Sequence, residues 1–197
     1  MTIEADDPGA WIVEARDEIR ERSLASSAWT HECHKLPWCS SETYVLQLVG
    51  EYLILLQVEA GSSEEVIELL GRALVKHGFA RRDLVESILA REKEFPTGIN
   101  TNVPFAIPHT NPEFTIRKGI AVATLKRPVT FCEMGNPDRS LDVSIVLMPA
   151  LTGRETDQKE FYRMLQLLED PRTANALLQS RSKQETRRLL QENPATS

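Results

Sequence analysis

Hydrophobic positions recur at regular intervals after residue 52 and predict alternating strands and helices. Residues 53–58 (LILLQV) form a short apolar run that is typical of a buried strand. Ser62 and Glu65 form a capping box, and the apolar residues after them recur at helical spacing until Gly78, which we expect to end the helix. A second helix is predicted over residues 83–94, with its own apolar stripe. The stripes of the two helices are Val66, Leu69, Leu70, Ala73 and Leu74, and then Leu84, Val85, Ile88 and Leu89.

The middle of the chain is predicted to be rich in strands and its end to be helical. Residues 102–107, 119–125 and 142–148 are short β-prone runs separated by Pro, Gly, Asn and Asp. A helix follows with Phe161, Met164, Leu165 and Leu168 as its stripe, and the Asp170-Pro171 pair interrupts it. A second capping box, Ser182 with Glu185, precedes a last helix that carries Leu189 and Leu190. Strands and helices in this order indicate an α/β domain.

The first 45 residues differ in character from the rest. A charged run over residues 14–22 is followed there by a small-residue stretch (SLASSAW) typical of a linker, and all three tryptophans lie in this part of the chain. The sequence leaves open whether this part is a peripheral helix, a disordered extension or sequence upstream of the true start. We therefore predict an N-terminal extension (1–45), one α/β domain (46–192) and a short tail (193–197).

Composition and charge narrow the class of protein. The 197 residues are 41% hydrophobic, which is enough for an ordinary core. The formal net charge of −6 argues against a general nucleic-acid binder, although residues 1–45 hold nine acidic and four basic side chains and so carry most of the excess. Three cysteines without framework spacing fit a reducing compartment, and no signal peptide or membrane span is recognisable. We expect a cytoplasmic protein.

Familiar catalytic motifs are missing from the sequence. It contains no phosphate-binding glycine loop, HExxH, GxSxG or CxxC. The best metal candidate is a cluster near the N-terminus, but its ligands lack the spaced pairs of zinc sites, so we favour a loose extension and expect no metal and no cofactor. That cluster consists of His31, Glu32, Cys33, His34 and Cys39.

His109 is the candidate for chemistry. It follows a predicted strand and lies between Pro108 and Pro112, which restrict the backbone on both sides. Reactive groups often occupy such connecting segments on a rigid scaffold, but a lone histidine in a proline-rich turn is more often structural.

A resemblance changes that balance. The segment AREKEFPTG (90–98), followed by FAIPH (105–109), resembles the EIIA domains of the bacterial phosphotransferase system, fructose/mannitol type. The continuation IAVATL (120–125), PVTF (128–131) and MGNPD (134–138) is most similar to the galactitol-type branch. The similarity covers residues 50–190, and it implies a mixed β-sheet flanked by helices.

The resemblance also implies a phosphotransferase chemistry. His109 would accept a phosphoryl group from the carrier protein HPr and pass it to an EIIB component, which serves a membrane EIIC in sugar or polyol uptake. A neutral imidazole nitrogen is the nucleophile, and an unperturbed pKa near ~6.5 leaves much of it neutral. Arg91 matches the family's active-site arginine and would stabilise the phosphate. Thr97 and Thr110 are candidates for contacts with phosphate oxygens.

Four further expectations concern the surroundings of His109. Mannitol-type relatives carry a second histidine where this chain has Asp157, and an acid there would repel a phosphate. Cys132 is expected to be an inert core cysteine. Phe114 is expected at the exposed rim of a docking surface, whereas Val103, Phe105 and Ile107 share one face of a strand, which we expect to be core.

Two alternatives to the transport role stay open. One is a regulatory module of the nitrogen-phosphotransferase type, which binds and controls a partner according to the phosphorylation of His109. The other is a structural domain that has kept the fold and lost the transfer.

Overall fold

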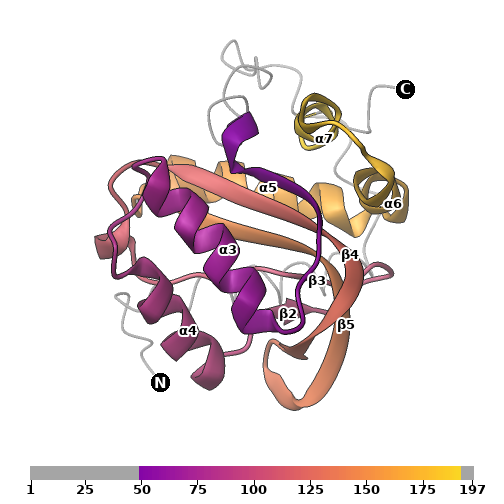
Figure 1. Ribbon diagram of the computed structural model, residues 1–197, viewed down its shortest axis with the longest axis horizontal. Coiled ribbons are helices and arrows are strands. Elements are labelled where there is room, and N and C mark those ends of the chain that lie inside the picture. Colours follow the sequence, from indigo (N-terminus) through magenta and orange to yellow (C-terminus); the bar gives the residue numbers. More distant parts are fainter. Residues whose placement is uncertain (1–48, 192–197) are drawn as a thin grey trace. The chain divides into compact units, whose positions relative to one another are not determined.

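The computed structural model describes residues 49–191 and contains a five-stranded mixed sheet with helices on both faces (Figure 1). This confirms the predicted α/β class and the mixed sheet. In chain order the elements are η2 (Glu51–Leu53), β1 (Ile54–Val58), α3 (Ser63–Lys76), α4 (Leu84–Glu94), β2 (Gly98–Ile99), β3 (Phe105–Ala106), η3 (Pro112–Phe114), β4 (Gly119–Glu133), β5 (Asn136–Ala150), α5 (Glu155–Glu169), α6 (Pro171–Gln179) and α7 (Lys183–Leu189).

The sheet is built around a long hairpin. β4 pairs antiparallel with β5 along most of its length and parallel with β1 on its other side. The two short strands β2 and β3 pair with each other. β2 also pairs with β4 at Glu133, next to the hairpin turn, and β3 pairs with β5 at Ile145 and Val146, in the middle of that strand. These four strands therefore form a closed circuit of pairings, and the segment that carries His109 leaves this circuit at the end of β3.

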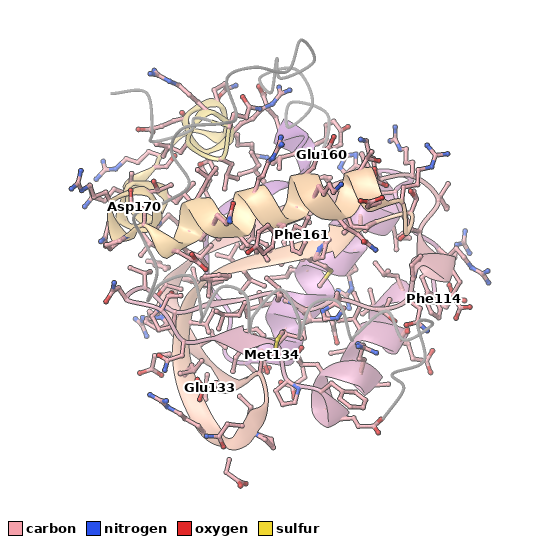
Figure 2. All side chains as sticks on the ribbon, turned by 180° about the vertical axis from the view of Figure 1, so that it is seen from behind. Phe114, Glu133, Met134, Glu160, Phe161 and Asp170 are labelled. Carbon is pink, nitrogen blue, oxygen red and sulfur yellow. The ribbon has the colours of Figure 1, made fainter. Side chains whose placement is uncertain are left out.

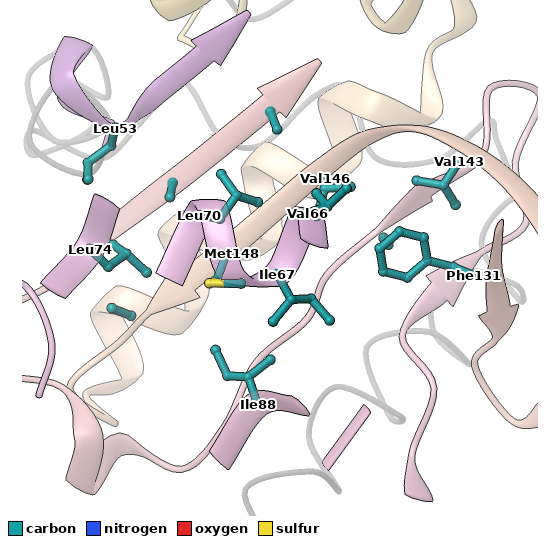
Figure 3. Packing of buried hydrophobic residues seen from close by; sticks show 14 of the residues in the cluster. Leu53, Val66, Ile67, Leu70, Leu74, Ile88, Phe131, Val143, Val146 and Met148 are labelled. Atoms are coloured by element: carbon teal, nitrogen blue, oxygen red, sulfur yellow. The ribbon is translucent and has the colours of Figure 1, made fainter. Parts of the chain in front are cut away.

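Helices cover the two faces of the sheet. α3 packs on β4 and β5 with α4 beside it, whereas α5 lies on the opposite face, the one toward the viewer in Figure 2. Between α3 and the sheet, Val66, Leu70 and Leu74 of α3 belong to one core cluster with Val146 and Met148 of β5, and Val66 lies beside Val146 (Figure 3). The prediction that Leu69 belongs to the buried stripe of α3 is wrong, because Leu69 is 40% exposed and Ile67 is buried instead.

Both predicted capping boxes form, with one difference. Ser62 Oγ accepts from Glu65 N at 3.3 Å, and Ser182 Oγ accepts from Glu185 N at 3.1 Å. In a capping box the glutamate side chain accepts from the backbone N of the N-cap residue. Here Glu65 and Glu185 accept instead from the residue before it, from Gly61 N at 2.7 Å and Arg181 N at 3.4 Å. The helix starts are nonetheless satisfied locally, which is why the sequence located them correctly.

The strand predictions were too short in the hairpin and too long before it. Residues 119–125 and 142–148 are only the parts of β4 and β5 that lie away from the hairpin turn. Of residues 102–107, only Phe105–Ala106 is strand. Pro128 suggested a break, but it lies in a register irregularity between Thr124 and Val129, where the missing N–H is tolerated.

One α-helix within residues 49–191 was missed. Asp170-Pro171 ends α5 as expected, but it also begins α6: Asp170 caps the helix by accepting from Arg172 N at 3.1 Å, and proline occupies the first turn. No helix within residues 49–191 is long and apolar enough to cross a membrane.

Candidate functional site

His109 lies just beyond β3, and its buried ring has a defined orientation. Its Nδ1 is 2.8 Å from the backbone oxygen of Ile107. A carbonyl oxygen only accepts, so Nδ1 carries the hydrogen and donates it. Nε2 is also buried, and no residue of the described chain hydrogen-bonds to it. In the neutral ring, Nε2 is therefore the nitrogen with the free lone pair.

The environment of His109 keeps this ring neutral. Its pKa is lowered to about 4: burial is the main cause, the hydrogen bond to Ile107 opposes it, and the nearby charge of Arg91 contributes to the lowering. At pH 7 the imidazole is therefore uncharged and its Nε2 is available as a nucleophile or a base.

One face of α4 forms a wall of the site. Ser87, Arg91 and Phe95 follow at intervals of four residues, which places them on the same side of the helix. Ser87 Oγ lies 2.5 Å from Thr110 Oγ1, and the Arg91 guanidinium stacks over Phe95 at 5.3 Å from the ring centroid. The Nε of Arg91 is buried and has no hydrogen-bond partner among residues 49–191. This wall offers an unused cationic donor beside His109.

The two threonines singled out in the sequence are both engaged. Thr97 is 1% exposed, and its N and Oγ1 donate to the two carboxylate oxygens of Glu92, at 3.0 and 2.7 Å. Its hydroxyl hydrogen is therefore already used, which argues against a direct phosphate contact. Thr110 pairs with Ser87 but lies next to His109 in sequence. Glu92 and Ser87 were missed, although the four-residue spacing from Ser87 to Arg91 was a usable signal.

Asp157 lies in a separate polar cluster. It is buried, and its carboxylate accepts from Thr152 N and Oγ1 and pairs with Lys118 Nζ at 3.5 Å. Lys118 also binds Glu160, 3.1 Å away, which lies along α5 in Figure 2. None of these contacts of Asp157 is to His109, and the single cation Lys118 is shared between the carboxylates of Asp157 and Glu160.

Three other sequence predictions have structural outcomes. Cys132 is half-buried, so it is less enclosed than predicted. Phe114 is not at an exposed rim: it is half-buried and packs on the main core, and the exposed apolar side chains near it in sequence include Ile116, at 62% exposure. Phe105 and Ile107 are fully in the core, as predicted, whereas Val103 is half-buried. The candidate metal cluster of residues 31–39 lies outside the described residues.

A comparison with protein families identifies the domain. The family model for the phosphoenolpyruvate-dependent sugar phosphotransferase system, EIIA 2, matches residues 47–193. The chain belongs to this family. The match includes every element from η2 to α7, and His109 and Arg91 lie within it.

Curated relatives of this EIIA 2 chain are longer proteins of two kinds. A probable licABCH operon regulator of Bacillus subtilis is 35% identical over 135 residues, which are 68% of this chain and 20% of that protein. The mannitol-specific EIICBA component of a Buchnera aphidicola strain is 33% identical over 95 residues, 47% of this chain and 14% of that protein. The chain thus spans a fifth or less of the length of these relatives.

Solved structures share the EIIA fold. The Escherichia coli mannitol IIA is 26% identical with a TM-score of 0.60, over 72% of this chain and 97% of that one. The same protein in complex with phosphorylated mannitol IIB is 26% identical with a TM-score of 0.61, over 73% of this chain and 98% of that one. The nitrogen regulatory IIA of Neisseria meningitidis, at 22% identity and a TM-score of 0.63 over 75% and 99%, shows likeness of fold alone.

Proposed function

We propose that this EIIA domain is a phosphohistidine carrier and that Nε2 of His109 takes the phosphoryl group. The observation that supports this proposal most is the fixed tautomer of a neutral, buried ring. Nδ1 carries the hydrogen and donates it to Ile107 O, so Nε2 carries no hydrogen and its lone pair is free. A nucleophile of this kind needs no base, because its lone pair is already free.

The transfer balances without a cofactor. The Nε2 lone pair forms a bond to phosphorus while the bond from phosphorus to the histidine nitrogen of phospho-HPr breaks, and that nitrogen keeps the electron pair. The ring of His109 becomes cationic, and the Ile107 carbonyl at Nδ1 stabilises it. In the onward step the nucleophile of EIIB attacks phosphorus, and the electron pair returns to Nε2.

Arg91 would neutralise the transferred group. Phosphoryl transfer depends mainly on positioning and on stabilising charge on the oxygens of phosphorus. Arg91 already acts electrostatically on His109, and its buried Nε is an unused donor. Phe95 stacks on the guanidinium and would limit the positions it can take. Thr110 is the threonine better placed to assist.

The partners and the sugar follow from the family and remain proposals. HPr would donate the phosphoryl group, EIIB would accept it and EIIC would carry the sugar or polyol, with the exchange taking place in the cytoplasm. The solved complex of mannitol IIA with phosphorylated mannitol IIB supports the EIIB step. Because relatives include mannitol-specific components, mannitol is better supported than the galactitol suggested by the sequence.

A regulatory role is the second candidate. Two relatives at 35% identity are named as regulators, the licABCH operon regulator and the transcriptional regulator ManR. In that case His109 would still be phosphorylated, but the state of the domain would control a partner instead of feeding EIIB. Neighbouring EIIB and EIIC genes would favour transport, and their absence regulation.

The decisive experiment is labelled phosphotransfer. The purified chain is incubated with enzyme I, HPr and labelled phosphoenolpyruvate, and we expect one acid-labile, base-stable phosphoryl group per chain. His109→Ala should abolish labelling, whereas His77→Gln, the matched control at the end of α3, should label as the parent does. Labelling of the His109 variant equal to that of the parent would refute the assignment.

A further inference from the structure

A continuous chain of hydrogen bonds leads from α4 to the imidazole of His109. Both oxygens of Glu92 accept from Thr97, at 3.0 Å from the backbone N and 2.7 Å from Oγ1. The backbone oxygen of Thr97 accepts from Ile107 N at 3.2 Å. The backbone oxygen of Ile107 accepts from His109 Nδ1 at 2.8 Å. In this series of hydrogen bonds, Glu92 therefore fixes Thr97, Thr97 fixes Ile107, and Ile107 fixes the ring of His109.

Glu92 is an unusual residue for a purely structural contact. Burial raises its pKa to about 7, so enclosing this carboxyl is costly, and the hydrogen bonds from Thr97 offset only part of that cost. No lysine or arginine of residues 49–191 forms an ion pair with it. Its two oxygens are instead both committed to a single residue, Thr97, on the path to His109.

The strands along this path are short. β2 and β3 have two residues each, paired as Gly98 with Ala106 and Ile99 with Phe105. The bond from Ile107 N to Thr97 O extends this small ladder by one step on the side of His109. The hydrogen bonds from Thr97 to Glu92 therefore fix the end of the ladder formed by Thr97 and Ile107. The carbonyl of Ile107 contacts His109 Nδ1 from this end.

We propose that Glu92 is a positioning residue for phosphoryl transfer: by clamping Thr97 it holds the Ile107 carbonyl against Nδ1 of His109 and so keeps the lone pair on Nε2. The consequence for the rate rests on the proposed function, whereas the consequence for the tautomer does not. Glu92 acts through Thr97 and Ile107 and does not touch the phosphoryl group.

Three variants separate this role from a general effect on stability. Glu92→Ala removes both acceptors. Glu92→Gln keeps an oxygen for Thr97 N, and its amide can donate to Thr97 Oγ1, so the clamp survives. Glu94→Ala is the matched control, because Glu94 is exposed on the same last turn of α4. Two quantities are measured: the tautomer of His109 from nitrogen-15 spectra of its ring at pH 7.5, and the rate of phosphorylation by phospho-HPr.

For Glu92→Ala we expect a mixture of both His109 tautomers and a rate lower by roughly 10- to 100-fold, the scale of a small misplacement of a reacting group. Glu92→Gln should keep the Nδ1–H tautomer and a rate within about 3-fold of the parent, and Glu94→Ala should match the parent. The proposal is overturned if Glu92→Ala folds and keeps both tautomer and rate, or if Glu92→Gln loses them.

Thr97→Val gives a second route if Glu92→Ala does not fold. It removes the hydroxyl from the clamp and keeps the backbone groups, so we expect a partial shift toward the second tautomer, and an unchanged tautomer counts against the proposal. The two proposals fail differently. If the parent protein takes no phosphate from HPr, the phosphocarrier role is wrong, while the ring spectra still decide the role of Glu92.

Discussion

At the scale of single residues, the buried His109 and the partly buried Glu92 have pKa values shifted in opposite directions at the same site. Burial lowers the pKa of His109 to about 4 and raises that of Glu92 to about 7. Both groups are therefore driven toward their neutral forms, as expected for a poorly solvated site. At pH 7 His109 is neutral and Glu92 is near its midpoint.

These shifts predict opposite pH dependences of stability. As pH falls from 6.5 to 4, the unfolded chain binds a proton at His109 before the folded chain does, so the folded state loses stability. As pH rises from 4.5 to 7, the unfolded chain releases the Glu92 proton first, so the folded state again loses stability. Each effect amounts to about 3 kcal/mol in full, and the two largely cancel between pH 4.5 and 6.5.

Single variants should expose each effect. In His109→Gln the free energy of unfolding should fall as pH rises through this window, relative to the parent. In Glu92→Gln it should rise with pH instead. Urea unfolding at a series of pH values measures both slopes. Parallel profiles for the two variants would contradict the assignment of the shifts.

At the scale of elements, the backbone of β2 lies in close contact with the end of β4. Gly98 pairs with Glu133, and Gly98 O accepts from Met134 N at 2.8 Å. A Cβ on Gly98 would lie 2.6 Å from the backbone oxygen of Cys132, an atom that cannot rotate away. Glycine is therefore required here by close approach of two backbones.

Gly98→Ala should move β2 away from β4. We expect a loss of about 1–3 kcal/mol in the free energy of unfolding, the usual cost of overpacking, and slower phosphorylation, because Thr97 moves with β2. Gly61→Ala is the control, since its nearest contact is the flexible end of Glu65, at 3.6 Å. Denaturant unfolding and the labelled transfer assay measure the two effects. Equal stability of the two variants would show that the backbones can separate freely.

Element predictions from the sequence succeeded where the determining contacts are local. The starts of α3 and α7 were found because Ser62 and Ser182 bind amides three residues away. The outer halves of β4 and β5 were missed because their polar residues are held by pairing with each other across the hairpin, and no local pattern records that pairing. α6 was missed because the same Asp-Pro pair that ends one helix begins the next.

At the scale of the whole domain, Lys118 at the start of β4 links the sheet to α5. It pairs with Asp157 and Glu160, and Asp157 also binds Thr152 in the preceding loop. That loop reaches the segment after His109, because a Cβ on Gly153 would lie 3.4 Å from Pro112. The cluster therefore ties α5 to the loop system on which His109 lies.

Asp157→Ala should destabilise the domain. It leaves Thr152 and one side of Lys118 without their buried acceptor, which we expect to cost about 2–3 kcal/mol and to lower Tm by roughly 5–10 °C. Glu59→Ala breaks only the exposed pair with Lys126 and should leave Tm unchanged. Thermal unfolding measures both. A Tm equal to that of the parent in Asp157→Ala would mean that Lys118 and Glu160 hold α5 without it.

The sequence by itself determined the α/β class and most helix boundaries, because these depend on local periodicity and capping. His109 and Arg91 were predicted from a motif within twenty residues. Only the tertiary structure decided which atoms the side chains of the site use. Thr97 is committed to Glu92, Phe114 to the core, and Asp157 to Lys118 and Thr152. A hydroxyl or a carboxylate can bind many partners, and its choice depends on which groups the packed chain brings within about 3 Å.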